Sequence, residues 1–311
     1  MSERLTADLR HLRPATIPEM ADHTFTLLAR RGNALLLLAM IAALPDLFLA
    51  VFRVRQTGEL LPAWQTALYL MLYILSEFSY AIALGCCFQT YLFPQRPLSF
   101  KALVRATVPR LPAFVLTRFV LQMAIVTLGG LLPTTLLVHV PAAENYPVRV
   151  ILAAACLLLT VRLLISWALV PVAIVIERKA FLGAAIRSSD LMRTPFSLKA
   201  LQDSPAVRAL LGFLPALVAA LSIIAIAQVC ATALDRPLIT PTDVAGLRDR
   251  KAGCFVRAAL ELFWTPLLAT LLTTLYVECR MRRDGLDFEV RLIENNAGPT
   301  SAMESELPGL V

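Results

Sequence analysis

Charged residues are scarce in this sequence. Asp, Glu, Lys and Arg make up only 16% of the 311 residues, whereas 58% are apolar and the mean hydropathy is +0.70. A soluble domain has about 25% charged residues. The charges also gather in short clusters between long uncharged runs, so they cannot cover a water-exposed surface. This scarcity excludes a water-soluble fold and predicts an integral membrane protein.

Residues that carry metal and catalytic chemistry are also few. The three histidines are scattered, and none of the six cysteines forms a CxxC pair. We therefore expect no zinc site and no disulfide scaffold. No paired histidines, periodic carboxylates or glycine-rich phosphate loop occur either, so we expect no cofactor and no enzymatic activity. An intramembrane enzyme is the weakest alternative, because it would lack a recognisable nucleophile and base.

Six apolar runs are each long enough to cross a bilayer, for which about 20 residues suffice. Each carries at most one charge. The second run has 33 residues, so that helix must tilt, bend or project from the membrane. Prolines in or beside the spans, such as Pro45 and Pro171, predict kinks. The runs are Ala34–Phe52, Pro62–Pro94, Leu111–Pro141, Val150–Ile176, Ala209–Leu234 and Ala258–Val277.

The basic residues predict the orientation of these spans. With the N-terminus inside, 19 of the 29 Lys and Arg residues fall in cytoplasmic segments and 8 in outer segments. Cytoplasmic loops carry this excess in membrane proteins, so both termini should be cytoplasmic. The net charge of +7 then reflects topology and attraction to anionic lipids, which makes nucleic-acid binding a poor interpretation. Five arginines precede the first span, so no signal peptide is expected.

A short string recurs before three pairs of spans. It is RPATIPEM from Arg13, RPLSFKAL from Arg96 and TPFSLKAL from Thr194. Thr16, Ser99 and Ser197 suit helix N-caps, and Glu19 stands where a capping box requires it. Such short matches also arise from ordinary loop chemistry, so the repeat is a hypothesis.

The second string opens an amphipathic stretch. Phe100, Leu103, Val104 and Thr107 share one helical face, and Lys101 and Arg105 share another. We predict an all-α integral membrane protein whose six transmembrane helices form three hairpins, each preceded by a cytoplasmic interfacial amphipathic helix. The parts are a cytoplasmic N-terminal segment with an amphipathic helix, a six-helix domain and a cytoplasmic tail that is disordered from about residue 295. Their ranges are 1–33, 34–280 and 281–311.

Charged residues inside spans are candidates for a functional site, because a charge in hydrocarbon is costly. Asp46, Glu77 and Arg162 should lie closest to the midplane, where Glu77 and Arg162 would pair and Asp46 would compete. Arg118 should extend to the cytoplasmic surface instead. The trio predicts either a structural ion pair or a transport site for a small solute.

Basic side chains at the predicted inner face are candidate contacts for anionic headgroups. The lipid bilayer is the expected partner, with a membrane or envelope protein as a further possibility. The candidates are Lys101, Arg105, Lys179, Arg187, Arg282 and Arg283.

Three segments carry a resemblance to a known family. They are residues 13–32, the stretch Pro171–Arg193 with Glu177 and its Ala-Ile-Arg-Ser, and the stretch Tyr276–Glu294. Together they resemble uncharacterised bacterial six-helix membrane proteins related to the membrane domain of glycerophosphoryl diester phosphodiesterases. The resemblance implies a bacterial cytoplasmic-membrane protein and supplies no catalytic residues. We therefore expect a non-enzymatic protein that acts with lipids or an envelope partner, or alternatively a small-solute transporter that uses the midplane trio.

Overall fold

The computed structural model describes residues 16–52, 62–93, 99–135, 146–179, 181–193, 207 and 251–284. Within these ranges the chain forms helices joined by short turns and contains no strand. The helices are α2 (Ile17–Ala42), α3 (Leu44–Phe52), α4 (Ala63–Leu92), α5 (Phe100–Thr107), η2 (Val108–Arg110), α6 (Leu111–Ile125), η3 (Val126–Leu131), α7 (Leu132–Thr134), α8 (Tyr146–Ser166), α9 (Val170–Glu177), α10 (Phe181–Met192) and α13 (Lys251–Asp284).

Five stretches of the described chain are long and apolar enough to cross a membrane. They overlap five of the six predicted runs, and the remaining run, Ala209–Leu234, lies outside the described residues. The expectation of a helical chain with several helices long and apolar enough to cross a membrane is therefore confirmed for the described residues. The stretches are Pro18–Leu49, Ala63–Leu92, Phe100–Leu131, Val150–Glu177 and Ala258–Asp284.

Two of the predicted helix starts are confirmed. The backbone N–H of Thr16 donates to Glu19 Oε2 at 2.8 Å, as in a capping box. Ser99 Oγ accepts a hydrogen bond from the backbone N–H of Ala102 at 3.4 Å. The third start, at Ser197, lies outside the described residues.

The first two predicted amphipathic helices are set off from the apolar runs that follow them, and their place at the membrane interface stays a prediction. Helix α2 joins two helical segments across a kink at Arg31 (φ −123°, ψ 16°), just before the apolar run that begins at Ala34. No proline lies between Glu19 and Ala42, so nothing removes a backbone donor there. Helix α5 ends at Thr107, and the 3-10 turn η2, which contains Pro109, separates it from α6.

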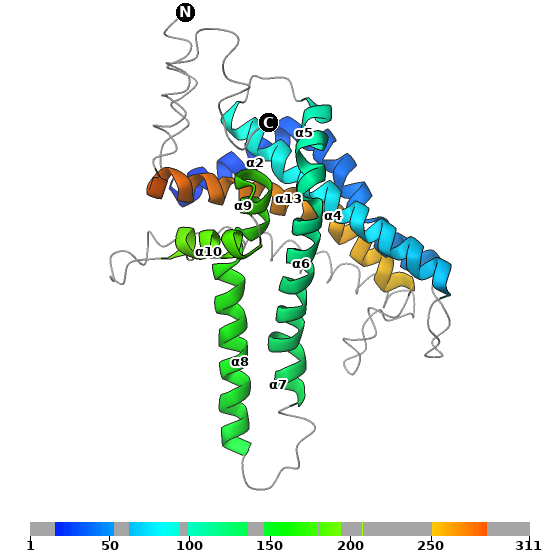
Figure 1. Ribbon diagram of the computed structural model, residues 1–311, viewed down its shortest axis with the longest axis vertical. Coiled ribbons are helices and arrows are strands. Elements are labelled where there is room, and N and C mark those ends of the chain that lie inside the picture. The colour runs from blue at the N-terminus through cyan, green and yellow to red at the C-terminus, as the bar shows by residue number, and fades with distance from the viewer. Residues whose placement is uncertain are drawn as a thin grey trace, which may run out of the picture.

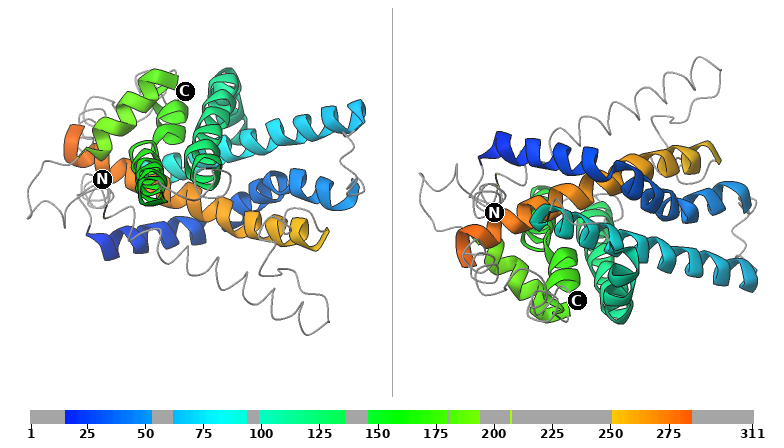
Figure 2. Two further views of the ribbon diagram at one scale, coloured as in Figure 1. Left: turned by 90° about the horizontal axis from the view of Figure 1, so that it is seen from below. Right: turned by 90° about the horizontal axis from the view of Figure 1, so that it is seen from above.

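Helices α2, α3, α4 and α13 pack together as a bundle (Figures 1 and 2). Its core holds Leu35, Leu84 and Tyr276, which come from α2, α4 and α13. The Nε of Arg31 also donates to Thr90 Oγ1 of α4 at 3.3 Å. The first and last described helices of the chain, α2 and α13, are neighbours in this bundle.

Helices α6, η3, α7 and α8 form a hairpin that projects from this bundle in a different direction (Figures 1 and 2). The stretches Phe100–Leu131 and Val150–Glu177 are 11% buried over their most apolar windows, against 44–61% for the other three. A Cβ on Gly129 would lie 3.0 Å from Thr160 Cγ2, so the two arms meet closely there. The hairpin leaves many large apolar side chains uncovered, as a lipid-facing element does, among them Leu116, Phe119, Met123, Leu131, Ile151, Leu158 and Val161.

A break between α8 and α9 lies just before Pro171, at the turn Trp167–Leu169. Proline lacks an N–H and clashes with the carbonyl four residues earlier. The hydroxyl of Ser188 in α10 donates to the Ser166 carbonyl at 2.7 Å and accepts from the Leu169 N–H at 3.2 Å. This single buried side chain therefore satisfies backbone groups on both sides of the break.

Candidate functional site

Glu77 forms an ion pair, but its partner is Arg118 rather than Arg162. The Arg118 Nε lies 3.1 Å from Glu77 Oε2, and the Glu77 residue is only 4% exposed. Arg162 is exposed on α8. The expected pairing of Glu77 with Arg162 was therefore wrong. Arg118, which was expected to extend to the cytoplasmic surface, pairs with Glu77 while its side chain stays 29% exposed. Helix α6 packs on α4, and depth along a span does not identify a helix's neighbours.

Aromatic side chains surround the Glu77–Arg118 pair. The Arg118 guanidinium lies 5.1 Å from the centroid of the Tyr80 ring, a cation–π distance. The Tyr73 hydroxyl donates to Gln122 Oε1 at 2.9 Å, which links α4 to α6 a second time. The pair thus lies on the α4–α6 contact with Glu77 buried and Arg118 partly exposed, an arrangement typical of a helix-packing ion pair.

Asp46, the third member of the predicted trio, is buried in the first turn of α3. A carboxylate is stabilised there by the positive end of the helix. Nearby, the Ser76 hydroxyl donates to the Ala42 carbonyl at 3.0 Å and joins α4 to the junction of α2 and α3. Because Arg162 lies exposed on α8, the structure does not assemble the predicted three-residue site.

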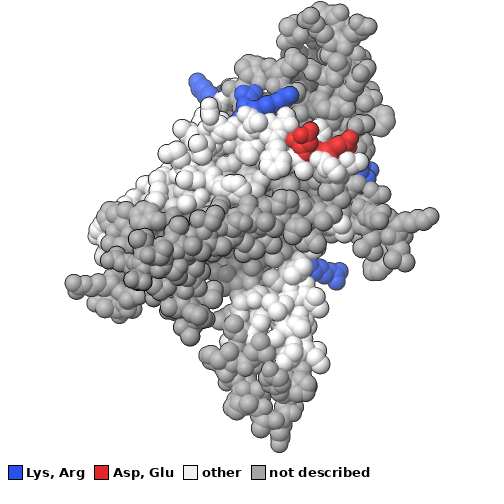
Figure 3. Space-filling model, turned by 180° about the vertical axis from the view of Figure 1, so that it is seen from behind, with Lys and Arg blue, Asp and Glu red and all other residues white. Residues whose placement is uncertain are grey.

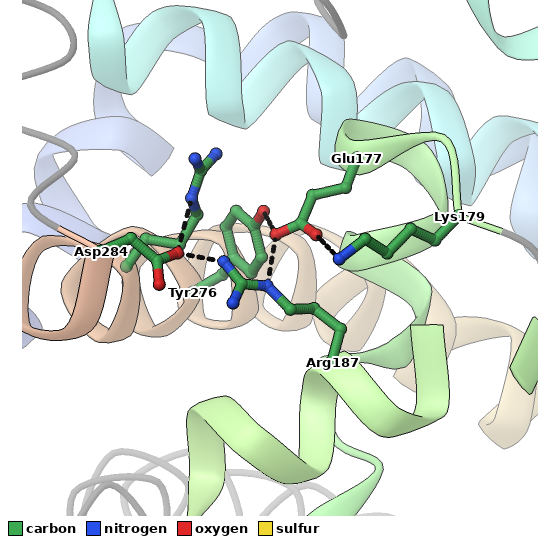
Figure 4. A network of polar contacts seen from close by, with 6 residues as sticks. Glu177, Lys179, Arg187, Tyr276 and Asp284 are labelled. Atoms are coloured by element: carbon green, nitrogen blue, oxygen red, sulfur yellow. Dashed lines mark hydrogen bonds and ion pairs between the residues drawn. The ribbon is translucent and has the colours of Figure 1, made fainter. Parts of the chain in front are cut away.

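A larger polar network lies where α9, α10 and α13 meet (Figure 4). It is centred on Glu177, the last residue of α9. Glu177 Oε1 accepts from the Tyr276 hydroxyl at 2.6 Å and from Arg187 Nε at 3.0 Å, and Lys179 Nζ lies 2.9 Å from Oε2. Glu177 therefore holds one residue from each flanking helix and one from the turn after α9.

Arg187 extends this network to the end of α13. Its second arm binds Asp284, whose Oδ2 also lies 3.4 Å from Arg280 Nε (Figure 4). Burial lowers the pKa of Arg187, but the hydrogen bonds that it donates to Asp284 and Glu177 raise it more, so the net shift is upward. Of the predicted headgroup contacts, Arg187 thus mainly joins α10 to α9 and α13 through internal ion pairs.

The other predicted headgroup contacts lie at the surface. Lys101 and Arg105 are exposed on α5, whose opposite face buries Leu103 and Thr107 as the amphipathic pattern predicts, while Phe100 is exposed. Lys179, Arg282 and Arg283 are also exposed. Arg282 pairs with the buried Glu278, and Arg283 donates to the Arg193 carbonyl.

Charge is distributed unevenly over the molecule. Figure 3 shows, on one face, basic and acidic side chains on the broad upper part, whereas the described surface of the narrow lower projection shows charge only near its upper end. Within the described residues, no group of three His, Cys, Asp or Glu side chains could hold a metal ion. The described surface therefore offers exposed Lys and Arg side chains that can bind anions, beside carboxylates that are already paired.

Sequence reasoning missed Arg118, Tyr276 and Asp284 as members of these clusters. Arg118 carried a usable signal, because a charge inside a span needs a partner. Tyr276 and Asp284 carried none, since their contacts to Glu177 and Arg187 join positions about 100 residues apart.

Comparisons with protein-family models, with curated proteins and with solved structures found no match to this chain.

Proposed function

We propose that this protein is a non-enzymatic, multi-pass protein of the bacterial cytoplasmic membrane that binds anionic lipid headgroups at its basic inner face. In this proposal the chain crosses the membrane six times as three hairpins, with Ala209–Leu234 as the fifth span and both termini in the cytoplasm. Kinship with the membrane domain of glycerophosphoryl diester phosphodiesterases belongs to the same proposal. An envelope protein could share the basic face.

One observation carries this proposal. The carboxylates at the junction of α9, α10 and α13 are held by internal partners, whereas the basic side chains around them remain exposed. In the two segments that meet at this junction, 177–193 and 278–284, seven Lys and Arg residues face four Asp and Glu residues, so the junction carries net positive charge even with its carboxylates paired. Each Lys or Arg near an anionic leaflet contributes about 1 kcal/mol to the attraction.

The direct pairing of Glu77 with Arg118 supports a packing role for the charges inside the spans. Each charge offsets the other's burial, so neither is left to attract a solute. This favours the lipid-binding function over the alternative of a small-solute transporter.

The experiment compares lipids in a neutral detergent. The full chain is titrated with phosphatidylglycerol or phosphatidylcholine while its thermal unfolding midpoint is followed, because a ligand that binds only the folded state raises that midpoint. We expect a larger rise with phosphatidylglycerol, and high salt should diminish the difference. Equal rises with the two lipids would overturn the proposal.

A matched pair of variants locates the effect. Replacing both Lys101 and Arg105 by Gln removes exposed charge from α5, and the preference for phosphatidylglycerol should weaken. Replacing Arg162 by Gln removes charge from the apolar hairpin and should leave that preference intact.

A further inference from the structure

Arg178 has an unusual backbone conformation at the end of α9. Its φ of 56° and ψ of 26° place it in the left-handed region, and among the described residues it is the only one other than glycine with positive φ. A helix that ends this way commonly has glycine at that position, because a Cβ is strained there. An arginine in this place therefore needs a reason other than the turn itself.

The turn separates two neighbouring side chains. Glu177 is directed inward, where Tyr276, Arg187 and Lys179 occupy its oxygens. Arg178 is exposed, and within the described part of the chain its guanidinium has no hydrogen bond or ion pair. Its five donors therefore remain free for a ligand.

A second guanidinium lies at the same end of α9. Arg110 donates from Nη1 to the carbonyl of Val175, in the last turn of α9. Burial, and after it repulsion by the charge of Arg178 three residues beyond Val175, lowers the pKa of Arg110. An anion between the two groups would turn this repulsion into two attractions, and a phosphate suits paired guanidinium forks because its oxygens accept two parallel hydrogen bonds.

The position of the two arginines agrees with the depth of lipid phosphates. Arg110 directly precedes the apolar run Leu111–Pro141, and Arg178 follows the run Val150–Ile176 after one residue. Both runs should end at the same surface of the membrane, where lipid headgroups begin. A phosphate ester of a lipid would therefore meet both guanidinium groups without leaving its leaflet.

We propose that Arg178 and Arg110 form a clamp for the phosphate of an anionic lipid headgroup at the end of α9. This proposal rests on the lipid-binding function proposed above and assigns that function a specific site. The left-handed turn is the device that presents Arg178 to the lipid while Glu177 stays in the polar network.

The test uses Arg178→Gly, because glycine removes the guanidinium and also the backbone strain. The variant should fold, and without lipid its unfolding midpoint should equal or exceed that of the unaltered chain. Its apparent Kd for short-chain phosphatidylglycerol in detergent should rise about tenfold, as expected for the loss of charge-assisted hydrogen bonds. Arg178→Lys, which keeps a charge but loses the planar fork, should fall between the two.

Arg193→Gly is the matched control. Arg193 is another exposed arginine directly after a helix end, that of α10, and it has no left-handed backbone. Its replacement should leave the Kd for phosphatidylglycerol within about twofold. An equal loss in the two glycine variants would overturn the clamp and leave only a diffuse effect of charge.

Two further results separate the proposals. If the unaltered chain prefers phosphatidylglycerol and Arg178→Gly retains that preference in full, the clamp is wrong and the lipid-binding function stands. If the unaltered chain shows no such preference, the function itself is wrong. Inorganic phosphate, added alone, distinguishes a free anion from a lipid: stabilisation by inorganic phosphate without stabilisation by phosphatidylglycerol would overturn the lipid assignment.

Discussion

Replacing Ser188 by Ala tests how the break between α8 and α9 is held together. The Ser188 residue is 0% exposed, and its hydroxyl serves the Ser166 carbonyl and the Leu169 N–H. No neighbouring bond replaces these two. The N–H of Ala168 goes to Ile165, that of Val170 goes to Trp167, and Pro171 has none.

The magnitude follows from the two groups left unpaired. A buried donor or acceptor without a partner costs about 1–3 kcal/mol. The higher helix propensity of Ala returns about 0.5 kcal/mol in α10. We therefore expect Ser188→Ala to lower the free energy of unfolding by about 1.5–5.5 kcal/mol, which makes it one of the more damaging removals of a single oxygen atom.

The assay is reversible unfolding in mixed micelles, with Ser189→Ala as the control. Ser189 is the next residue of α10 and is partly exposed, so its replacement should change the free energy of unfolding by less than about 0.5 kcal/mol. A second background sharpens the test. In Pro171→Ala the helix can regain its regular hydrogen bonds across the break, and Ser188→Ala should then cost less.

Two outcomes would refute this reasoning. One is a Ser188→Ala variant that unfolds within about 0.5 kcal/mol of Ser189→Ala. The other is an unchanged cost of Ser188→Ala in the Pro171→Ala background, which would mean that the hydroxyl does not serve the break.

Three further predictions concern the charged pair, the hairpin and the topology. Arg118→Ala should destabilise the protein by about 3–5 kcal/mol, because it leaves the buried Glu77 carboxylate without its partner. Adding Glu77→Ala should therefore recover part of that loss, and additive losses in detergent unfolding would contradict a mutual pair. Gly129→Ala should loosen the hairpin by about 1–3 kcal/mol, because the new methyl would lie 3.0 Å from a side-chain carbon of α8, whereas Gly130→Ala meets nothing within 4 Å and should be neutral or stabilising in the same assay. Single cysteines tested with a membrane-impermeant thiol reagent on intact cells should be protected at inner positions and labelled at outer ones, and labelling of the inner set would invalidate the orientation. The inner positions are Arg105, Arg187 and Arg291, and the outer positions are Glu59, Glu144 and Asp243.

Local features of this protein were accessible from sequence because they depend on residues close together in the chain. The five described spans follow from long apolar runs. The caps at Thr16 and Ser99 and the buried face of α5 follow from contacts within one or two helical turns. The kink at Arg31 and the turn η2 also fall at boundaries that the local sequence indicated, just before the apolar runs from Ala34 and Leu111.

What only the tertiary structure decided is which helices are neighbours. Depth in the membrane was estimated from the position of a charge along its run, and this suggested Arg162 for Glu77. The packing of α6 on α4 instead brings Arg118 to Glu77 as its ion-pair partner. Apolar runs of similar length do not specify which helices pack against each other, because lipid and protein interiors are equally apolar.

The network around Glu177 shows the same division. Sequence alone placed Glu177 and Arg187 at a membrane boundary and marked the segment from Tyr276 as notable. Their assembly depends on α13 returning beside α2 and past the end of α9, which only the folded chain reveals. A hydrogen bond needs its donor and acceptor within about 3 Å, and for residues about 100 positions apart that proximity is a property of the fold rather than of either segment.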